Sequence, residues 1–390
     1  MTLHIFNPEH DIALASGLAN FTAPHAGRQL RHDLGYLPAL WAEEGDGVLV
    51  VSTDVAARAY HKLSQRIKAL HGKVATPADG LFTAAPLCAD GSRPAAIDPW
   101  GWNAALAAQL RRMGVVPALF PSTAQMQAIR ELSHRRTAMQ LLSQLRSDGT
   151  VGEAFECRTA AQVDELVAQY GHVVLKAPWS SSGRGLRFVD VSMTAEARQG
   201  LDGWLANVLS RQGSVMVEPY YNKVKDFGME FVVRADGTVS YEGLSLFHTK
   251  NGAYTGNILA TETAKREMLG RYLSLELLDN TQEAICRLLP QIIKGQYTGP
   301  LGVDMMVAPS CLPQLGEVAA HEDSATGTSP SWGRQEGAAL HPCVEINLRR
   351  TMGHVALALT PLVNPAGDDG IVRVMRIDFT DHYELKIEQL

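Results

Sequence analysis

The sequence has few cysteines and no sign of a site built on them. Its five cysteines are scattered, and none is spaced from another cysteine or from a histidine as in a zinc site or a disulfide framework. No apolar run approaches the roughly 18 residues of a membrane helix, and the N-terminus lacks a basic segment followed by a long apolar core. We therefore expect a cytoplasmic protein without a membrane partner.

Positive charge is also scarce. Lys and Arg number 35 against 41 Asp and Glu, which gives a net charge of −6 and a pI near 6.1. A general nucleic-acid binder needs a basic face, so we expect no nucleic-acid partner. A hydrophobic content of 46% over 390 residues is that of a globular protein, and this length favours two or three packed subdomains.

The first third of the chain alternates strands with helices, which indicates a parallel, Rossmann-like sheet. The apolar spacing predicts strands at 3–6 and 47–52, helices at 27–44, 54–71 and 103–113, a strand at 115–120, and one long helix from 122 to about 145.

A polar cluster, Asn7 to Asp11, follows the first strand and precedes a short helix. Ligands of open α/β sheets bind beyond the carboxyl ends of the strands, so the cluster is a candidate substrate contact. One aspartate would equally well cap the helix, with solvated neighbours. We give these two interpretations equal weight.

After Gly149 the pattern changes to shorter strands and hairpins. We expect strands near 153–157, 172–175 and 214–217, helices at 159–170, 195–211 and 262–294, a hairpin after Asp226 followed by a polar loop at 248–257, and strands at 303–307 and 343–348. Residues 309–342 are rich in Ser, Thr, Gly and Pro, which predicts a long excursion or a flexible insert.

The strand at 172–175 ends on Lys176 and passes into a loop of serines and glycines. Such a loop supplies hydroxyls, backbone N–H groups and the backbone freedom to wrap a phosphate chain. The order of residues differs from a P-loop, in which the lysine follows the glycines, and a plain connection is the alternative. The candidate phosphate contacts are Lys176, Ser181, Ser182, Gly183, Arg184 and Gly185.

Two polar side chains near the C-terminal end, Glu345 and Asn347, share one face of a strand because side chains alternate. If the strand with Asp304 is their antiparallel partner, three oxygen ligands converge, and such a set suits Mg²⁺. The alternative is that Glu345 and Asn347 face water. Asp304 has apolar neighbours, so a cation or an arginine should lie near it.

The order of these elements resembles the ATP-grasp superfamily. The resemblance covers roughly 122–353, through the segments VVLK, SSSGRG, VMVEPYY, DFGMEFVV, GPLGVDMMV and VEINLRRTMG. It implies a mixed α/β and α+β chain: a Rossmann-like pre-ATP-grasp domain at 1–121, a small subdomain with the phosphate lid at 122–219, and a C-terminal subdomain with the metal site at 220–390, including the 309–342 insert.

The resemblance also implies roles for single residues. Lys176 and the following loop would hold the phosphates of ATP, and Asp304, Glu345 and Asn347 would hold Mg²⁺, with Mn²⁺ as an alternative. The remaining nucleotide contacts would be Glu218 and Tyr220 beside the adenine, Glu230 at the ribose, and Arg136 at a phosphate. For Arg135 we prefer a solvated position. Arg349, Arg350 and Lys250 would surround the transferring phosphoryl group or the acceptor.

These residues together predict an ATP-dependent ligase that joins a carboxylate to an amine or thiol through an acyl phosphate, releasing ADP and phosphate. Two alternatives remain at this stage: a kinase acting on a small-molecule hydroxyl, and a nucleotide-binding regulator without turnover. The expected partners are ATP, a small carboxylate and an amine, and a homodimer is left open.

Overall fold

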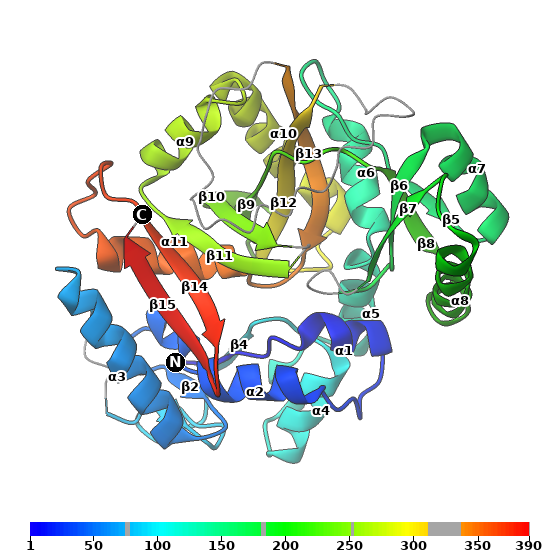
Figure 1. The fold of residues 1–390 in the computed structure, drawn as a ribbon. Helices are drawn as coiled ribbons and strands as arrows, with labels where there is room; N and C mark the ends of the chain where they lie inside the picture. Colours follow the sequence, from blue (N-terminus) through cyan, green and yellow to red (C-terminus); the bar gives the residue numbers. More distant parts are fainter. Residues whose placement is uncertain (75–78, 181–184, 251–252, 311–336, 390) are drawn as a thin grey trace.

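The computed structural model describes residues 1–74, 79–180, 185–250, 253–310 and 337–389, without the side chain of Lys250. The described chain forms three sheets, arranged around a common centre in Figure 1. The predicted mixed α/β class is confirmed, with one parallel sheet followed by two sheets of antiparallel strands. None of the helices in this part of the chain is long and apolar enough to cross a membrane.

The N-terminal sheet is parallel and has the strand order β3-β2-β1-β4. Its strands are β1 (Thr2–Ile5), β2 (Gly47–Leu49), β3 (Phe82–Thr83) and β4 (Ala96–Pro99), and its helices are α1 (His10–Ser16), α2 (His25–Leu34), α3 (Thr53–Ala69) and α4 (Ala104–Arg112). The predicted strand at 115–120 is wrong. That stretch is a 3₁₀ turn, Pro117–Leu119, where the proline has no N–H to give to a ladder.

The predicted helix of 122–145 is divided into α5 (Thr123–Leu132) and α6 (Arg136–Leu145). Two backbone N–H groups leave the helical pattern at the break: the Arg135 N–H donates to the carbonyl of Pro178, and the Arg136 N–H donates to the His134 ring. α6 packs on β13 and α10, so its apolar face belongs to the core of the largest sheet.

A four-stranded antiparallel sheet, β5-β8-β6-β7, stands at one side of the molecule in Figure 1 with α7 (Ala160–Tyr170) and α8 (Ala195–Gln212). Its strands are β5 (Phe155–Cys157), β6 (His172–Lys176), β7 (Leu186–Asp190) and β8 (Val215–Pro219). Val173 and Leu175 of β6 are fully buried, as the run of branched apolar residues predicts.

The largest sheet has the order β13-β12-β9-β10-β11-β14-β15. Its strands are β9 (Lys225–Val233), β10 (Val239–Lys250), β11 (Ala253–Leu259), β12 (Gly299–Pro309), β13 (Ala338–Asn347), β14 (Arg373–Phe379) and β15 (Tyr383–Gln389), and its helices are α9 (Glu262–Gly270), α10 (Leu275–Ile293) and α11 (Met352–Val363). The predicted polar loop at 248–257 is therefore the end of β10 and most of β11. Of the predicted insert, 338–342 belongs to β13, and 311–336 lies outside the described residues.

The C-terminal segment returns to the N-terminal domain. Val355 and Leu359 of α11 share an apolar core with Leu63 and Ile67 of α3, and this core also contains Met375 of β14. Through this shared core, the parallel sheet is held against the end of β13, where the predicted metal ligands lie.

Candidate active site

A cleft of about 340 Å³ lies where the three sheets meet. The N-terminal domain, the four-stranded sheet, the largest sheet and the N-terminus of α11 all contribute to its lining. The polar residues among them are Asp11, Arg135, Lys176, Glu230, Ser245, Thr249, Tyr254, Asn257, Asp304, Glu345, Asn347, Arg349 and Thr351. Elements that are far apart in sequence thus bring acids and bases together in one cavity.

The three predicted metal ligands converge, as the strand pattern predicts. β12 and β13 are antiparallel, with Asp304 directly opposite Glu345, and the Asn347 amide donates to Asp304 Oδ2 at 3.0 Å. On the other side of Asp304, β9 presents Gly228. A Cβ there would lie 3.1 Å from the Val303 carbonyl oxygen and 3.4 Å from Asp304 Oδ1, so the glycine lets β9 and β12 approach closely beside the carboxylate.

The electrostatics at Asp304 favour a cation. Burial, together with the negative charges of Glu345 and Glu230, raises the pKa of Asp304 to about 8. Within the described residues, no arginine or lysine forms an ion pair with this carboxylate. Two carboxylates and an amide oxygen are donors that Mg²⁺ accepts, and a divalent cation would relieve the repulsion between the carboxylates. The residues present therefore fit the predicted ion.

Lys176 occupies the end of β6 and is buried in a pair with Glu218 of β8. Lys176 Nζ lies 2.5 Å from Glu218 Oε2, and both side chains are less than a tenth exposed. Lys176 lines the cleft. The nearby Tyr220 stacks on His172 at 4.1 Å between ring centroids, outside the cleft lining. In this structure Glu218 thus neutralises the lysine that is expected to meet phosphate.

Of the neighbouring residues Arg135 and Arg136, Arg135 is the one that lines the cleft. Arg135 Nη1 lies 2.9 Å from Glu345 Oε2, and its guanidinium also donates to the Ala177 carbonyl and the Ser180 hydroxyl. Arg136 instead pairs with Glu156 at 3.1 Å and does not line the cleft. The expectation of a solvated Arg135 is therefore wrong, and the predicted phosphate contact Arg136 is not brought to the other site residues.

The sequence does indicate that Arg135, rather than Arg136, lies on the buried side of the helix. The buried positions of α6, namely Ala138, Leu141, Leu142 and Leu145, lie three to ten residues after Arg135 at helical spacing. Extending that stripe back by one turn places Arg135 on the buried side and Arg136 away from it.

Arg349 lines the cleft, and Arg350 does not. Arg349 forms a two-pronged pair with Asp11 at 2.8 and 2.7 Å and donates to Asn347 Oδ1 at 2.9 Å. Although burial opposes both shifts, this pairing lowers the pKa of Asp11 and raises the pKa of Arg349. The predicted role of Arg350 at the phosphoryl group is not supported, since its guanidinium pairs with Asp98 at 2.8 Å and lies over the Trp41 ring.

The polar cluster after β1 does not cap α1, because no side chain makes a capping hydrogen bond there. Its members serve other contacts. Asn7 donates to the Gly101 carbonyl at 2.9 Å, Glu9 pairs with Arg31, and Asp11 holds Arg349. Of the two interpretations of the cluster, the cap is wrong, and Asp11 reaches the cleft.

Glu230 is brought to the cleft but is only 2% exposed. Its Oε1 accepts from the Thr351 hydroxyl at 2.8 Å, and its Oε2 lies 3.0 Å from His354 Nδ1. Gly353 allows this close packing, since a Cβ there would lie 1.9 Å from Glu230 Oε1. The carboxylate thus faces the N-terminus of α11. The contact between Glu230 and a ribose stays a prediction.

Part of the predicted phosphate loop, Ser181 to Arg184, lies outside the described residues, as does the side chain of Lys250. Gly185 is described and buried, and its carbonyl accepts from the Ala177 N–H at 2.8 Å. A Cβ on Gly185 would lie 2.4 Å from Ser180, so the two ends of the loop meet closely only with a glycine.

A row of polar side chains that sequence reasoning only partly identified covers one wall of the cleft. The Tyr254 hydroxyl donates to Asn257 Oδ1 at 2.6 Å, and the Asn257 amide donates to the Ser245 hydroxyl at 2.8 Å. Tyr254 and Asn257 lie within the polar loop predicted at 248–257. Ser245 was missed because an apolar strand surrounds it.

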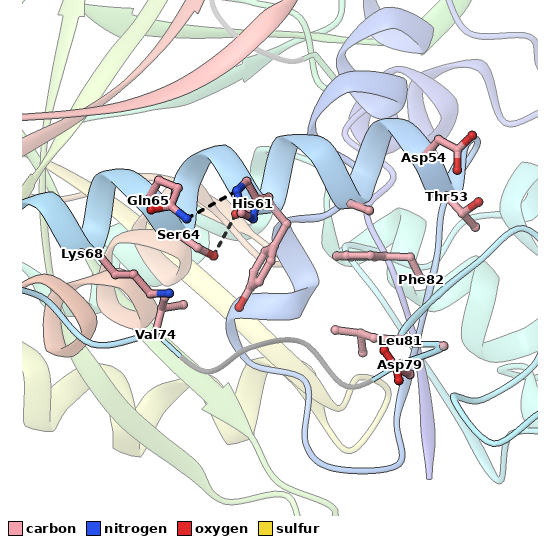
Figure 2. A pocket seen from close by; sticks show the side chains of 13 residues that line it. Thr53, Asp54, His61, Ser64, Gln65, Lys68, Val74, Asp79, Leu81 and Phe82 are labelled. Atoms are coloured by element: carbon pink, nitrogen blue, oxygen red, sulfur yellow. Dashed lines mark hydrogen bonds between the residues drawn. The ribbon is translucent and has the colours of Figure 1, made fainter.

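A larger hollow of about 450 Å³ lies beside α3 and shares no lining residue with the cleft. In Figure 2 two of its polar groups bond within α3: Gln65 to His61 at 3.4 Å, and the Ser64 hydroxyl to the carbonyl of Tyr60 at 2.9 Å. Acids and bases do not converge there as they do in the cleft, so we take the cleft as the candidate active site.

No protein-family model and no curated protein sequence matches the chain. The structure is similar to N5-carboxyaminoimidazole synthetase from Staphylococcus aureus complexed with ADP, with a TM-score of 0.46 and 13% identity over 97% of this chain and 82% of that one. It is also similar to the biotin carboxylase domain of 2-oxoglutarate carboxylase from Hydrogenobacter thermophilus, in complex with MgADP, ADP and bicarbonate, with a TM-score of 0.45 and 14% identity over 73% of this chain.

A third similar structure is biotin carboxylase from Campylobacter jejuni, with a TM-score of 0.44 and 14% identity. This chain spans 58% and 59% of the two carboxylase chains, less than two thirds of their length. Because these TM-scores are below 0.5, the similarities add nothing to the fold beyond the strand orders given above.

Proposed function

We propose that the chain is an ATP-grasp ligase that uses ATP and Mg²⁺ to join a carboxylate to an amine or thiol. The observation that carries this proposal is the convergence of Asp304, Glu345 and Asn347 in a cleft that also contains Lys176 and Arg349. A cation site beside two positively charged side chains suits a reaction in which the negative charge of a phosphoryl group must be neutralised.

In this proposal, the side chains bind and orient the triphosphate. Lys176 leaves Glu218 to meet phosphate oxygens, and Glu218 then turns toward the base of the nucleotide. Arg135 sits between the start of the loop and Glu345, where it would contact the terminal phosphates. Asp304, Glu345 and Asn347 would hold Mg²⁺, which supplies charge neutralisation at the phosphoryl oxygens. Mn²⁺ is expected to substitute for it.

The substrate carboxylate attacks the γ-phosphorus of ATP in this scheme, forming an acyl phosphate and releasing ADP. The amine or thiol then attacks the acyl carbon, and phosphate leaves. Arg349 is held by Asp11 at the edge of the cleft, where it would stabilise the negative charge of the carboxylate and the acyl phosphate. A homodimer and a cytoplasmic location belong to the proposal and are testable by sedimentation and by cell fractionation.

Hydroxylamine trapping tests the proposed reaction. The protein is mixed with Mg-ATP, hydroxylamine and a panel of amino acids and short carboxylic acids. Formation of a hydroxamate together with ADP is expected for at least one acid. ATP binding without turnover on any acid would reject the ligase in favour of a nucleotide binder, and transfer of phosphate to a hydroxyl would favour a kinase.

Replacing a proposed ligand tests the metal assignment. Glu345→Gln removes the charge opposite Asp304 and is expected to abolish Mg-dependent turnover while circular dichroism and the melting temperature stay close to wild type. Glu388→Gln is the control, because Glu388 is a half-exposed carboxylate on β15. Equal turnover of Glu345→Gln and the control would reject the metal site.

A further inference from the structure

A second hollow, of about 650 Å³, opens in the N-terminal domain and shares no lining residue with the cleft. Glu9 follows β1, Val51 follows β2 and Asn103 follows β4, and all three line it. It therefore lies beyond the carboxyl ends of three parallel strands, the place where open α/β sheets bind ligands.

The walls of this hollow carry an excess of positive charge. Arg28 and Arg31 of α2 and Arg112 of α4 line it, against the single carboxylate of Glu9. Three arginines and one glutamate give a formal charge of 3 − 1 = +2, in a protein whose net charge is −6. Arg28 and Arg112 are exposed; the Arg28 guanidinium donates to the backbone carbonyl of Ala23, and in the described part of the chain neither arginine forms an ion pair.

Glu9 adds an acceptor that lacks a partner. Its Oε1 lies 2.8 Å from Arg31 Nη1, which in turn lies 3.2 Å from Gln109 Oε1. Its Oε2 is buried, and no donor among the described residues bonds to it. Glu9 lines the hollow, and a buried acceptor without a partner is costly, so a turn of this side chain that brings Oε2 to a donor in the hollow would be favourable.

Apolar side chains complete the lining. Phe21 and Val51, which is 59% exposed, offer apolar surface among the charged groups, whereas Ala13 and Leu106 are already buried. A bound molecule would cover this apolar surface, while its charged ends meet the arginines and Glu9.

We propose that this hollow binds a small molecule with an anionic group, an amino group and an apolar body, as in an α-amino acid with an apolar side chain. Arg28 and Arg112 bind the anion, and the free oxygen of Glu9 accepts from the ammonium group. This site rests on the proposed function in its amine form, since it would supply the amine that is joined to the carboxylate, but its binding can be measured without ATP or turnover.

The test uses four probes and ligand-observed NMR on the full chain. L-phenylalanine carries both groups, 3-phenylpropionate only the carboxylate, 2-phenylethylamine only the amine, and phenyl phosphate a different anion. We expect L-phenylalanine to bind most tightly, 3-phenylpropionate more weakly, and 2-phenylethylamine not at all. Phenyl phosphate binding as tightly as L-phenylalanine would overturn the assignment of a zwitterion in favour of a phosphate site.

Variants place the binding in the hollow. Arg28→Gln combined with Arg112→Gln should weaken L-phenylalanine binding at least about tenfold, since two charge-assisted hydrogen bonds are lost. Arg93→Gln combined with Arg158→Gln changes the net charge equally at exposed positions outside the lining and should leave binding within about twofold. Glu9→Gln should weaken L-phenylalanine but not 3-phenylpropionate.

Equal binding by the two double variants, or no binding of any probe to the wild type, would overturn the proposal. The Glu345→Gln variant separates this result from the proposed function. It should still bind L-phenylalanine, and loss of binding in that variant would instead place the probe in the cleft.

Discussion

Arg135 and Arg136 are neighbours of the same type that point in opposite directions, which makes them a sharp test of the site. Arg135 pairs with Glu345 in the cleft, and its side chain is 8% exposed. Arg136 pairs with Glu156 on the four-stranded sheet, and its side chain is 42% exposed. Replacing each in turn with methionine removes the charge and keeps much of the apolar stem.

The size of the effect follows from the contacts. A hydrogen bond to a charged group contributes about 1.5–3 kcal/mol, and every 1.4 kcal/mol is a factor of about ten. Arg135→Met removes the guanidinium that is proposed to contact the terminal phosphates, and with it at least one such hydrogen bond to the bound nucleotide, besides its contacts to Glu345 and to the start of the predicted phosphate loop. The expected loss in kcat/KM for ATP is therefore at least about 10- to 140-fold. Arg136→Met breaks a partly exposed pair and should change kcat/KM by less than about fivefold.

The assay is ADP release from Mg-ATP with whichever acid gives a hydroxamate, and melting temperatures show whether both variants remain folded. Tight nucleotide binding without turnover can be followed by titration with an ATP analogue. If both variants fold and Arg136→Met loses more activity than Arg135→Met, the assignment of Arg135 to the nucleotide cleft is wrong.

Two further predictions concern stability. Gly353→Ala puts a methyl group 1.9 Å from the Glu230 carboxylate and should lower the free energy of unfolding in urea by about 1–3 kcal/mol. The control, Gly200→Ala, lies on an open helix face and should leave this free energy unchanged or raise it. Equal effects of the two substitutions would refute the close packing at Gly353. Burial opposes the charged form of His4, but carboxylates on both ring nitrogens raise the pKa of His4 above 6.5. Its stabilisation is therefore full below about pH 6.5 and is lost as the pH rises through the raised pKa. Unfolding free energies from about pH 6 to about pH 9 should fall more steeply in the wild type than in His4→Gln, and parallel curves would reject this.

The features that the sequence predicted well are those set by local periodicity. Alternation along β13 puts Glu345 and Asn347 on one face, and antiparallel pairing with β12 brings Asp304 opposite Glu345. The end of β6 fixes Lys176 in the same way. These positions depend on a period of two residues and on a single strand pairing, so a short stretch of sequence is enough to infer them.

The features that it missed depend on contacts between distant elements. At the break between α5 and α6, the Arg135 N–H bonds to the carbonyl of Pro178 and the Arg136 N–H to the His134 ring, contacts that helical spacing does not contain. The strand expected at 115–120 has the right apolar residues, but it pairs with no strand in the described part of the chain, and a proline interrupts it. A local residue pattern limits which secondary structures a segment can adopt, and its tertiary contacts determine which of them it adopts.

The two arginines after Asn347 show how a distant contact changes the meaning of a motif. From sequence alone, two cations beside a metal site suggested two ligands for a phosphoryl group. Arg350 instead pairs with Asp98. Arg349 lines the cleft while paired with Asp11, which is 338 residues away in the sequence. Asp11 therefore sets how far Arg349 extends into the cleft, since removal of Asp11 would leave a buried guanidinium free to turn toward Asp304 or Glu345. By this argument, Asp11→Asn should weaken Mg²⁺ activation of turnover, although Asp11 contacts none of the proposed ligands except through Arg349.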